Sequence, residues 1–289
     1  MLTALLKTMR PRQWTKNVFV FAPLVFDKQL LILNAFLRTA AGFVLFCMIS
    51  SAVYIFNDLA DIEADREHPV KKNRPIPSGQ LPLGLAWAVG ILLVTIALVI
   101  GYLLSPSFAM VVATYFLLNL AYSKWLKHIL ILDVLILATG FVLRVGAGVT
   151  MIHVERFSPW LYVVMTLLAL YLGFGKRRAE LALLANEAGA HRKVFDDYSI
   201  PLLDQYIMIV SGTTIVAYSF YTFSAPNVPA NHTMMLTVPF VMYAIFRYLY
   251  LVQVKHAGGA PEEIQLSDRP LQISLFLWAL VVLAVFYLS

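Results

Sequence analysis

The first candidate for chemistry is a set of oxygen-bearing side chains that follow a long apolar stretch at three- and four-residue spacing: Asn57, Asp58, Asp61 and Asp65. On a helix this spacing places all four along one face. Mg2+ prefers oxygen ligands and is commonly held by a few carboxylates together with substrate phosphates. The sequence therefore predicts a Mg2+ site with Asp58 and Asp61 as catalytic ligands. Asn57 and Asp65 would assist them, directly or through water.

The alternative is a solvated acidic helix end without a metal. Ionisable groups beside membrane-length segments are costly and tend to be functional, which favours the metal interpretation. Arg74 follows at the end of a basic stretch that includes Lys71 and Lys72, and it is a candidate partner for phosphate.

Further cations and polar groups lie at the ends of apolar segments. Tyr122, Lys124 and Lys127 close one such segment, and phosphate binding competes there with simple snorkelling of the lysines. Asp133 and Arg144 lie eleven residues apart in the next segment, on one face if it is helical. A buried Arg requires an anion or a carboxylate, whereas a lone intramembrane Asp often pairs with a neighbouring helix.

The longest polar connection opens with Lys176, Arg177, Arg178 and Glu180. Three consecutive cations cannot share one helix face, so some of them mark only the membrane boundary. Glu180 can pair with Lys176 or join a metal site. Further along, the charged residues favour an anion-binding cap over a cavity, with a solvated amphipathic loop as the alternative; they are His191, Arg192, Lys193, Asp196 and Asp197.

The composition identifies the class of protein that must position these residues. Of 289 residues 60% are hydrophobic and only 13% are charged, which excludes an ordinary soluble domain. The single cysteine, Cys47, excludes an intrachain disulfide. Most of the 22 Lys and Arg residues lie in short connections, so the net charge of +6 reports membrane topology and anionic substrates and gives no reason to expect nucleic-acid binding.

Apolar segments of membrane length predict an all-α polytopic protein with nine transmembrane helices around a central cavity. The expected spans are 17 to 34, 37 to 56, 84 to 104, 107 to 123, 128 to 150, 158 to 175, 203 to 223, 233 to 252 and 270 to 288. The first is interrupted by Pro23, Asp27 and Lys28, so a bent or re-entrant segment is expected there. Basic residues concentrate in alternate connections, which places the N-terminus and the acidic motif in the cytoplasm and the C-terminus outside.

Several motifs together resemble one family. They are Asn57-Asp58-x-x-Asp61-x-x-x-Asp65, the stretch Asn73-Arg74-Pro75-Ile76-Pro77-Ser78-Gly79, and Tyr122-Ser123-x-x-x-Lys127. Nearly the whole chain, 1–289, resembles a single domain of the UbiA-type superfamily of intramembrane transferases. The stretches 10–17, 140–144 and 175–181 are similar to its branch of decaprenyl-phosphate phosphoribosyltransferases.

The resemblance implies Mg2+-dependent transfer of 5-phosphoribose from phosphoribosyl diphosphate to a polyprenyl phosphate, towards a lipid-linked arabinose donor for cell-wall synthesis. It implies a bacterial plasma membrane, with the active site on the cytoplasmic side among membrane lipids. Substrate-binding candidates are then Lys16, Arg74, Tyr122, Lys124, Lys127, Arg144, Lys176, Arg177, Arg178 and Glu180, of which the cations other than Arg144 are the candidates for binding phosphate. The sequence leaves open whether the protein forms a homo-oligomer.

One departure from the broader superfamily bears on the choice of reaction. Its prenyltransferases usually carry a second Asp-x-x-x-Asp motif, whereas this chain has Lys176-Arg177-Arg178-Ala179-Glu180 there. Cations in place of metal-binding acids suit extra substrate phosphates. An aromatic prenyltransferase with a polyprenyl diphosphate donor, and a non-enzymatic membrane transporter, are the alternatives. An ionised lipid phosphate needs no general base, so none is expected.

Overall fold

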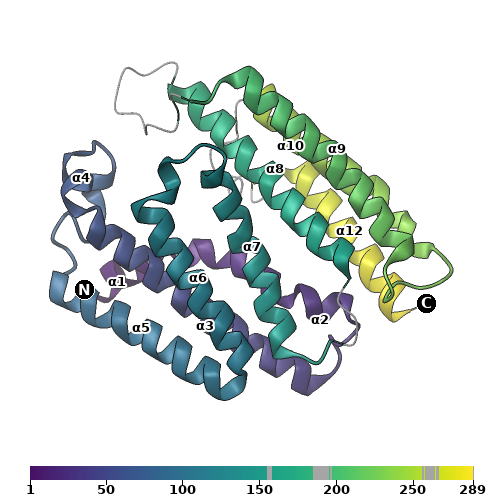
Figure 1. Cartoon of the computed structure of the whole chain (residues 1–289), viewed down its shortest axis with the longest axis horizontal. Helices are drawn as coiled ribbons and strands as arrows, with labels where there is room; N and C mark the ends of the chain where they lie inside the picture. Colours follow the sequence, from purple (N-terminus) through teal and green to yellow (C-terminus); the bar gives the residue numbers. More distant parts are fainter. Residues whose placement is uncertain are drawn as a thin grey trace. The chain divides into compact units, whose positions relative to one another are not determined.

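Helices and turns make up the part of the chain that the structure, a computed structural model, describes: residues 1–154, 158–184, 195, 197–255, 257, 264 and 267–288. Eight helical segments in this part are long and apolar enough to cross a membrane (Figure 1). They are α3 (Leu33–Ala60), α5 (Leu83–Leu104), α6 (Pro106–Lys124), α7 (Leu132–Met151), α8 (Pro159–Leu184), α9 (Ile200–Ser224), η5 (Thr233–Thr237) with α10 (Val238–Gln253), and α12 (Arg269–Tyr287). The predicted all-α membrane fold is confirmed.

The predicted count of nine spans is not confirmed. In place of a first span at 17 to 34, the structure has a 3-10 helix, η1 (Pro11–Phe21), and a short α-helix, α2 (Ala22–Phe26), which ends before the turn at Asp27 and Lys28. An additional short helix, α1 (Leu2–Met9), precedes them. Lys28 has a positive φ of 57°, which no α-helix tolerates, so the expected interruption is confirmed at this residue.

Capping residues before proline define where three of the long helices begin. Ser105, Ser199 and Asp268 each accept a hydrogen bond from a backbone N–H in the first turn of α6, α9 and α12, respectively. In each case a proline occupies the first or second helical position, where its missing N–H costs nothing. These starts are therefore specified locally by the sequence.

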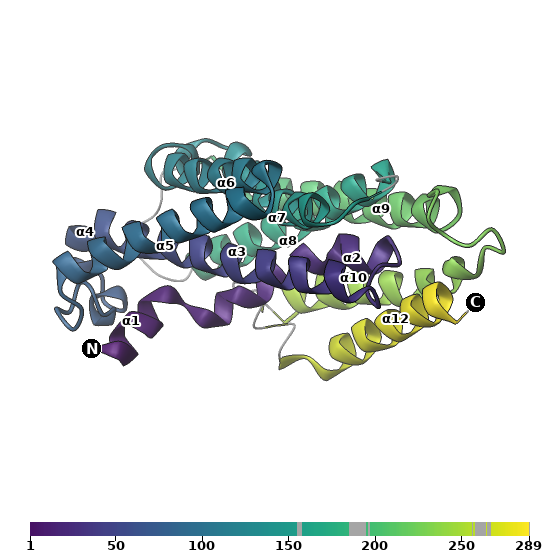
Figure 2. The same ribbon diagram turned by 90° about the horizontal axis from the view of Figure 1, so that it is seen from below.

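Two compact units make up the chain, and each has its own core. Unit 1 comprises 1–25, 29–125 and 143–153; unit 2 comprises 26–28, 126–142 and 154–289. In unit 1, α3 packs against α1, η1, α5 and α6 (Figure 2). Gly148 of α7 is essential to this packing, because a Cβ there would lie only 2.0 Å from the carbonyl oxygen of Val20 in η1. The second half of α7 thus belongs to unit 1.

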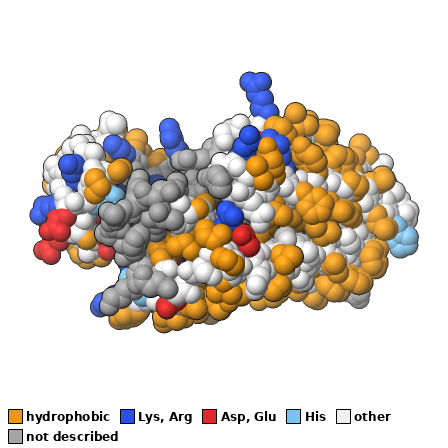
Figure 3. Space-filling model, turned by 90° about the horizontal axis from the view of Figure 1, so that it is seen from above, with side chains coloured by type: hydrophobic (Ala, Val, Ile, Leu, Met, Phe, Trp, Pro, Cys, Tyr) orange, Lys and Arg blue, Asp and Glu red, His pale blue; other side chains and the backbone are white. Residues whose placement is uncertain are grey.

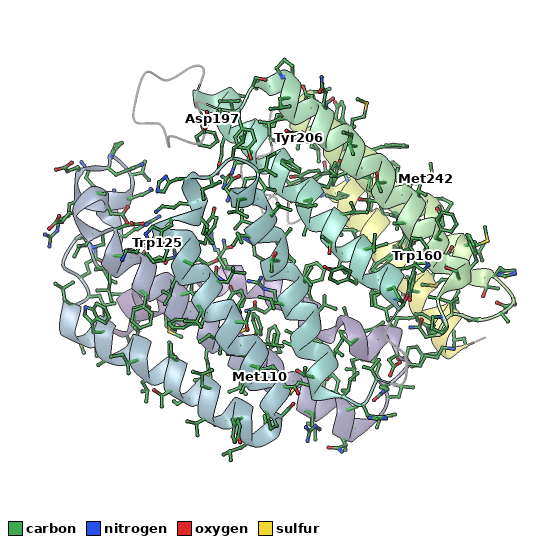
Figure 4. The ribbon with its side chains drawn as sticks, viewed as in Figure 1. Met110, Trp125, Trp160, Asp197, Tyr206 and Met242 are labelled. Atoms are coloured by element: carbon green, nitrogen blue, oxygen red, sulfur yellow. The ribbon has the colours of Figure 1, made fainter. Side chains whose placement is uncertain are left out.

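Unit 2 is built around the pair α8 and α9, which lie side by side, with α10 and α12 also packed together. Trp160 at the start of α8 stacks on Phe220 near the end of α9, with ring centroids 5.1 Å apart. Figure 4 shows Trp160 at one end of this helix pair and Asp197, just ahead of α9, at the other. The two helices are therefore antiparallel, and the first half of α7 joins their core through Val134.

Large apolar side chains cover much of the surface of the described residues. Leu103 is 77% exposed and Phe276 is 63% exposed, and both belong to membrane-length helices. Figure 3 shows hydrophobic side chains spread broadly over one face. A water-soluble monomer rarely exposes so much apolar surface, whereas lipid tails accept it. The chain is an integral membrane protein.

Candidate functional site

The acidic motif lies where α3 gives way to the short helix α4 (Ile62–Glu67). The sequence predicts one helix face for all four residues, but the α-helix breaks at Asp61, whose ψ is 12°. Backbone hydrogen bonds from Asp61 to Asn57 and from Asp65 to Asp61 continue the four-residue spacing through the break. The motif side chains therefore stay in sequence along a bent helical segment, with Asp58 and Asp65 buried and Asp61 and Asn57 half-buried.

Asp58 and Asp65 are joined by arginine. Both are 2% exposed. Nη1 of Arg74 lies 3.1 Å from Oδ1 of Asp58 and 2.6 Å from Oδ2 of Asp65, so a single guanidinium nitrogen binds both carboxylates. Lys71 lies 3.8 Å from the other oxygen of Asp65. Arg74 therefore lies at the acidic motif with carboxylates as its partners, and its binding of phosphate stays a prediction.

Arg10 is a member of this cluster that the sequence analysis did not select. Its Nη2 lies 2.6 Å from Oδ1 of Asp58, and its guanidinium lies 4.7 Å from the ring centre of Tyr54. Arg10 joins α1 to η1 with a left-handed φ of 53°, an uncommon conformation outside glycine. This turn directs the Arg10 side chain towards Asp58, which lies 48 residues further along the sequence. We call Arg10, Asp58, Asp65, Lys71 and Arg74 the acidic cluster.

The donor set of the motif fits Mg2+ in chemistry but is not arranged as a finished metal site. Carboxylate and amide oxygens are the ligands that Mg2+ prefers, and the shared Arg74 nitrogen keeps Asp58 and Asp65 close together. However, no group of three or more His, Cys, Asp or Glu side chains in the described part of the chain is positioned to hold a metal ion. The metal assignment of Asn57, Asp58, Asp61 and Asp65 stays a prediction.

The candidate phosphate ligands are divided between the units. Lys16 on η1, Tyr122 and Lys124 at the end of α6 belong to unit 1, and Lys127 in the 3-10 turn η3 (Leu126–His128) belongs to unit 2. Nζ of Lys124 lies 4.9 Å from the ring centre of Trp125, its exposed neighbour (Figure 4). Lys16, Tyr122 and Lys127 are half-buried. Their roles in substrate binding stay predictions.

Arg144 is buried in the helix packing of unit 1. Its Nε donates to Oδ1 of Asn17 at 2.9 Å and its Nη2 donates to the hydroxyl of Tyr115 at 2.9 Å. The guanidinium also lies 4.9 Å from the ring centre of Tyr115 and 5.6 Å from that of Phe46. Asn17 in turn donates to Ser50 of α3. These contacts give Arg144 a structural role in joining η1, α3, α6 and α7, and substrate contact stays a prediction.

In unit 2 the cationic motif is organised by a buried ion pair. Nε of Arg177 lies 2.6 Å from Oδ2 of Asp133, and these side chains are 2% and 0% exposed. Arg177 also pairs with Glu180. Tyr198 donates to Asp133 at 2.8 Å and accepts from the backbone of Ile131. Burial, reinforced by Asp133, raises the pKa of the Tyr198 phenol well above its ordinary range, so this group stays a neutral donor.

The consecutive cations of this motif do not all share one partner: Lys176 and Arg177 both pair with Glu180, whereas Arg178 does not. Lys176 lies 3.9 Å from Glu180 and is 35% exposed, whereas Arg178 is tied to Asp204 at 2.6 Å. Asp133 therefore pairs with a neighbouring helix, which confirms the structural alternative for that residue. Of the predicted cap over a cavity, His191, Arg192, Lys193 and Asp196 lie outside the described residues.

A cavity of about 450 Å³ lies in unit 1 at the opposite end of α3 from the acidic motif. Its lining includes Arg38, whose Nε and Nη2 donate to the carbonyls of Met151 and Leu104, the last residues of α7 and α5. The guanidinium thus caps two helix C-termini, where a positive charge is favourable. None of the predicted site residues lines this cavity, so we assign the chemistry to the acidic cluster instead.

A family model described as the UbiA prenyltransferase family matches residues 19–261. The chain belongs to this family. Among UbiA members it is 35% identical to a decaprenyl-phosphate phosphoribosyltransferase from Mycolicibacterium smegmatis, over 100% of this chain and 94% of the relative. It is 33% identical to the protein of the same name from Corynebacterium glutamicum, over 98% and 87% of the two chains.

The UbiA fold is also evident from solved structures. A UbiA homologue from Archaeoglobus fulgidus bound to GPP and Mg2+ aligns with a TM-score of 0.74 over 98% of this chain and 99% of that one, at 17% identity. At this identity the similarity concerns the fold alone. The transferase class and the membrane-embedded fold predicted from the sequence are confirmed.

Three residues of this UbiA chain that matter to the clusters escaped the sequence analysis: Arg10, Tyr198 and Asp204. Arg10 lies in the stretch 10–17 that carries part of the family resemblance but was not selected as a site residue, and its positive φ cannot be read from sequence. Tyr198 donates to Asp133, which lies 65 residues away in the sequence. Asp204 accepts from Arg178, which lies 26 residues away. Pairing between segments this distant follows from the fold, so no local pattern identifies it.

Proposed function

We propose that this protein transfers the 5-phosphoribosyl group from phosphoribosyl diphosphate to a polyprenyl phosphate, decaprenyl phosphate being the expected lipid, with release of diphosphate. The observation that carries the proposal is the full-length similarity to two decaprenyl-phosphate phosphoribosyltransferases. The acidic cluster supports it, because carboxylates and arginines beside a membrane suit a reaction of phosphate groups. A transporter would have no evident use for this arrangement.

Asp58 and Asp61, assisted by Asn57 and Asp65, are the residues that we assign to Mg2+. When bound, Mg2+ would supply positive charge next to the departing diphosphate. Solved structures of UbiA homologues with Mg2+ support the use of this metal in the family. Whether a second ion binds near Glu180 is a separate question, and the pairing of Glu180 with Arg177 and Lys176 speaks against it.

The other residues that we assign to the reaction are cations that bind and orient phosphates. Arg10 and Arg74 belong to the acidic cluster, and Lys16 lies on η1, which begins directly after Arg10. An Arg fork binds phosphate oxygens in two parallel hydrogen bonds. Of the motif at 176–178 we assign Lys176 alone to phosphate, since Arg177 and Arg178 are held in 2.6 Å ion pairs with little exposure, whereas Lys176 is 35% exposed and lies 3.9 Å from Glu180. The accepting lipid phosphate is already ionised at neutral pH, so the reaction requires no general base.

We also propose that residues 1–289 form a single integral membrane domain with the active site on the cytoplasmic side of a bacterial plasma membrane. The two compact units are not consecutive in the chain: unit 1 takes residues 143–153 from α7, and unit 2 takes 26–28 from the N-terminal region. This interleaving supports one domain. The cytoplasmic assignment rests on the basic residues around the acidic motif.

The test is release of diphosphate by the purified protein in detergent with Mg2+ and phosphoribosyl diphosphate, with and without a polyprenyl phosphate. We expect release only when the lipid phosphate is present. The second candidate is an aromatic prenyltransferase, and the description of the family supports its prenyl-transferring part. Turnover of a polyprenyl diphosphate with an aromatic acid, without turnover of phosphoribosyl diphosphate, would establish that alternative instead.

A further inference from the structure

The carboxylate oxygens assigned to the metal already accept strong hydrogen bonds from cations. Oδ1 of Asp58 accepts from both Arg10 and Arg74, at 2.6 and 3.1 Å, and Oδ2 of Asp65 accepts from Arg74 at 2.6 Å. The carboxylate side chains are 3% exposed, whereas the side chains of Arg10 and Arg74 are 31% and 30% exposed. The acids are therefore fixed inside the protein, and the arginines reach them from a more open side.

A divalent cation and these guanidinium groups compete for the same oxygens. An oxygen that accepts two charge-assisted hydrogen bonds has both lone pairs directed at the donors. A divalent cation at this oxygen would also lie within a few ångströms of two positive charges, and repulsion is strong where water is largely excluded. Binding of a metal through Oδ1 of Asp58 and Oδ2 of Asp65 therefore requires Arg10 and Arg74 to move away.

We propose that the acidic cluster works by exchange of counterions, a proposal that rests on the proposed function. Mg2+ replaces the arginines on Asp58 and Asp65, and the released guanidinium groups of Arg10 and Arg74 bind the diphosphate of the donor. Metal binding alone would release the two arginines with no anion to pair with them, and diphosphate binding alone would take the arginines away from the two carboxylates. Metal and diphosphate therefore bind cooperatively, and Arg10 is a diphosphate-binding residue of the reaction.

Cooperative binding has a measurable size and is reciprocal. A coupling of the usual strength between two ligands changes affinity by roughly 5- to 150-fold. We expect inorganic pyrophosphate to strengthen metal binding by about 10- to 100-fold. By thermodynamic linkage the metal strengthens pyrophosphate binding by the same factor. Metal alone is expected to bind weakly, because it must displace the arginines with no anion to receive them.

The experiment measures binding of Mn2+, as a paramagnetic substitute for Mg2+, by electron paramagnetic resonance on the purified chain. Titrations with and without inorganic pyrophosphate are corrected for the Mn2+–pyrophosphate complex with a protein-free sample. Arg74→Gln and Arg10→Gln each remove one competing charge. Each variant is expected to bind Mn2+ alone about tenfold more tightly than the wild type, and to bind pyrophosphate more weakly.

Two matched variants separate competition from general damage. Arg66 lies on the same helix as Asp65 but donates to the carbonyl of Pro77, so Arg66→Gln removes a nearby charge without opening the carboxylates. It is expected to leave Mn2+ affinity unchanged within about twofold. Arg74→Lys keeps the charge and is expected to bind Mn2+ alone as weakly as the wild type. Size-exclusion chromatography verifies folding, and Arg10→Gln serves if Arg74→Gln does not fold.

The outcomes distinguish this exchange from the proposed function. Mn2+ binding that is equal with and without pyrophosphate, and unchanged or weakened in both Gln variants, would mean that the ion pairs are purely structural and would overturn the exchange. Lipid-phosphate-dependent diphosphate release could still stand in that case. No Mn2+ binding by any variant under any condition would overturn both the exchange and the metal assignment. Tighter Mn2+ binding by the Gln variants would support the exchange.

Discussion

Asp61 differs from the other two carboxylates of its motif at the scale of single residues. Asp58 and Asp65 are buried and bound by arginine, whereas Asp61 is half-buried and stands at the break between α3 and α4. A carboxylate in this position can reach a ligand without first leaving a helix interior. We therefore expect Asp61 to contribute to turnover far more than to stability.

Asp61→Asn is expected to lower Mg2+-dependent diphosphate release by at least about 100-fold, the usual cost of removing one electrostatic contact to a transition state. The thermal unfolding midpoint should stay close to that of the wild type. Glu63→Gln is the control, because Glu63 is an exposed acid of the adjoining helix α4. Full activity in a well-folded Asp61→Asn protein would remove Asp61 from the metal site.

Arg177 and Lys176 are adjacent cations with opposite expected roles. Arg177→Met would leave Asp133 buried and unpaired, which costs about 3–5 kcal/mol of folding free energy. Combining it with Asp133→Asn removes both charges and keeps an acceptor for Tyr198, so the double variant should lose less than the sum of the single variants. Unfolding in detergent, followed by tryptophan fluorescence, measures these losses.

Lys176→Gln provides the contrast. Its pair with Glu180 is partly exposed and is worth less than about 1 kcal/mol, so stability should barely change while diphosphate release falls. If Arg177→Met were as stable as the wild type and specifically lost activity, the buried pair would have a role at the substrate instead of in the fold.

At the scale of helices, the parts predicted from sequence are those that depend on local pattern. The spans were predicted from apolar length alone, and α6, α9 and α12 lie within a few residues of the expected positions; their caps Ser105, Ser199 and Asp268 are equally local features. The 3-10 helix η1 was not expected, because its apolar second half has no periodicity that distinguishes it from an α-helix. Its shape follows from docking on α3 and α7, where Trp14 donates to Ser51 and Gly148 touches Val20.

The candidate site also has parts that can be predicted from local pattern and parts that cannot. The motif at Asp58 and Asp61 could be read from side-chain types and spacing alone. The ion pairs of Arg10 and Arg177 could not, since each joins segments more than 40 residues apart. A cation in a loop looks the same in the sequence whether it will bind substrate or a buried acid. The sequence therefore yields candidate ligands but cannot separate the two roles, and binding of metal or substrate by these residues stays a prediction.

Two glycines of α7 test the close approach of η1. Gly148→Ala would place a methyl group 2.0 Å from the carbonyl oxygen of Val20, which is rigid backbone, so η1 must shift. We expect a loss of stability of about 1–3 kcal/mol, as for other overpacked sites. Gly146, half a turn away, has nothing within 4 Å of an added Cβ, and Gly146→Ala should be neutral or stabilising by up to about 1 kcal/mol. Equal effects of the two variants would contradict the close packing.

For the whole molecule, the number of membrane crossings determines whether the two termini share a side. Eight crossings place them on the same side, and nine place them on opposite sides. η1 has eleven residues with a rise of about 2.0 Å per residue, and α2 has five residues with a rise of about 1.5 Å per residue. Their combined length approaches the roughly 30 Å thickness of a hydrocarbon core. Only the two segments together are long enough to make the ninth crossing. We therefore expect the N-terminus inside and the C-terminus outside.

Cysteine labelling can decide between these topologies, because the chain has a single buried cysteine, Cys47. In a Cys47→Ser background, Leu2→Cys reports on the N-terminal end, where Leu2 is 72% exposed, and Leu288→Cys on the C-terminal end, where Leu288 is 86% exposed. Ser78→Cys reports on the exposed loop after the acidic motif. A membrane-impermeant maleimide added to spheroplasts should label Leu288→Cys at once, and Leu2→Cys and Ser78→Cys only after permeabilisation. Labelling of Leu2→Cys and Leu288→Cys under the same condition would mean eight crossings, since the termini would then share one side of the membrane and η1 would not cross. Labelling of Ser78→Cys in intact spheroplasts would instead mean that the orientation is the reverse of the expected one. The acidic cluster would then lie on the side of the membrane away from the pool of phosphorylated metabolites.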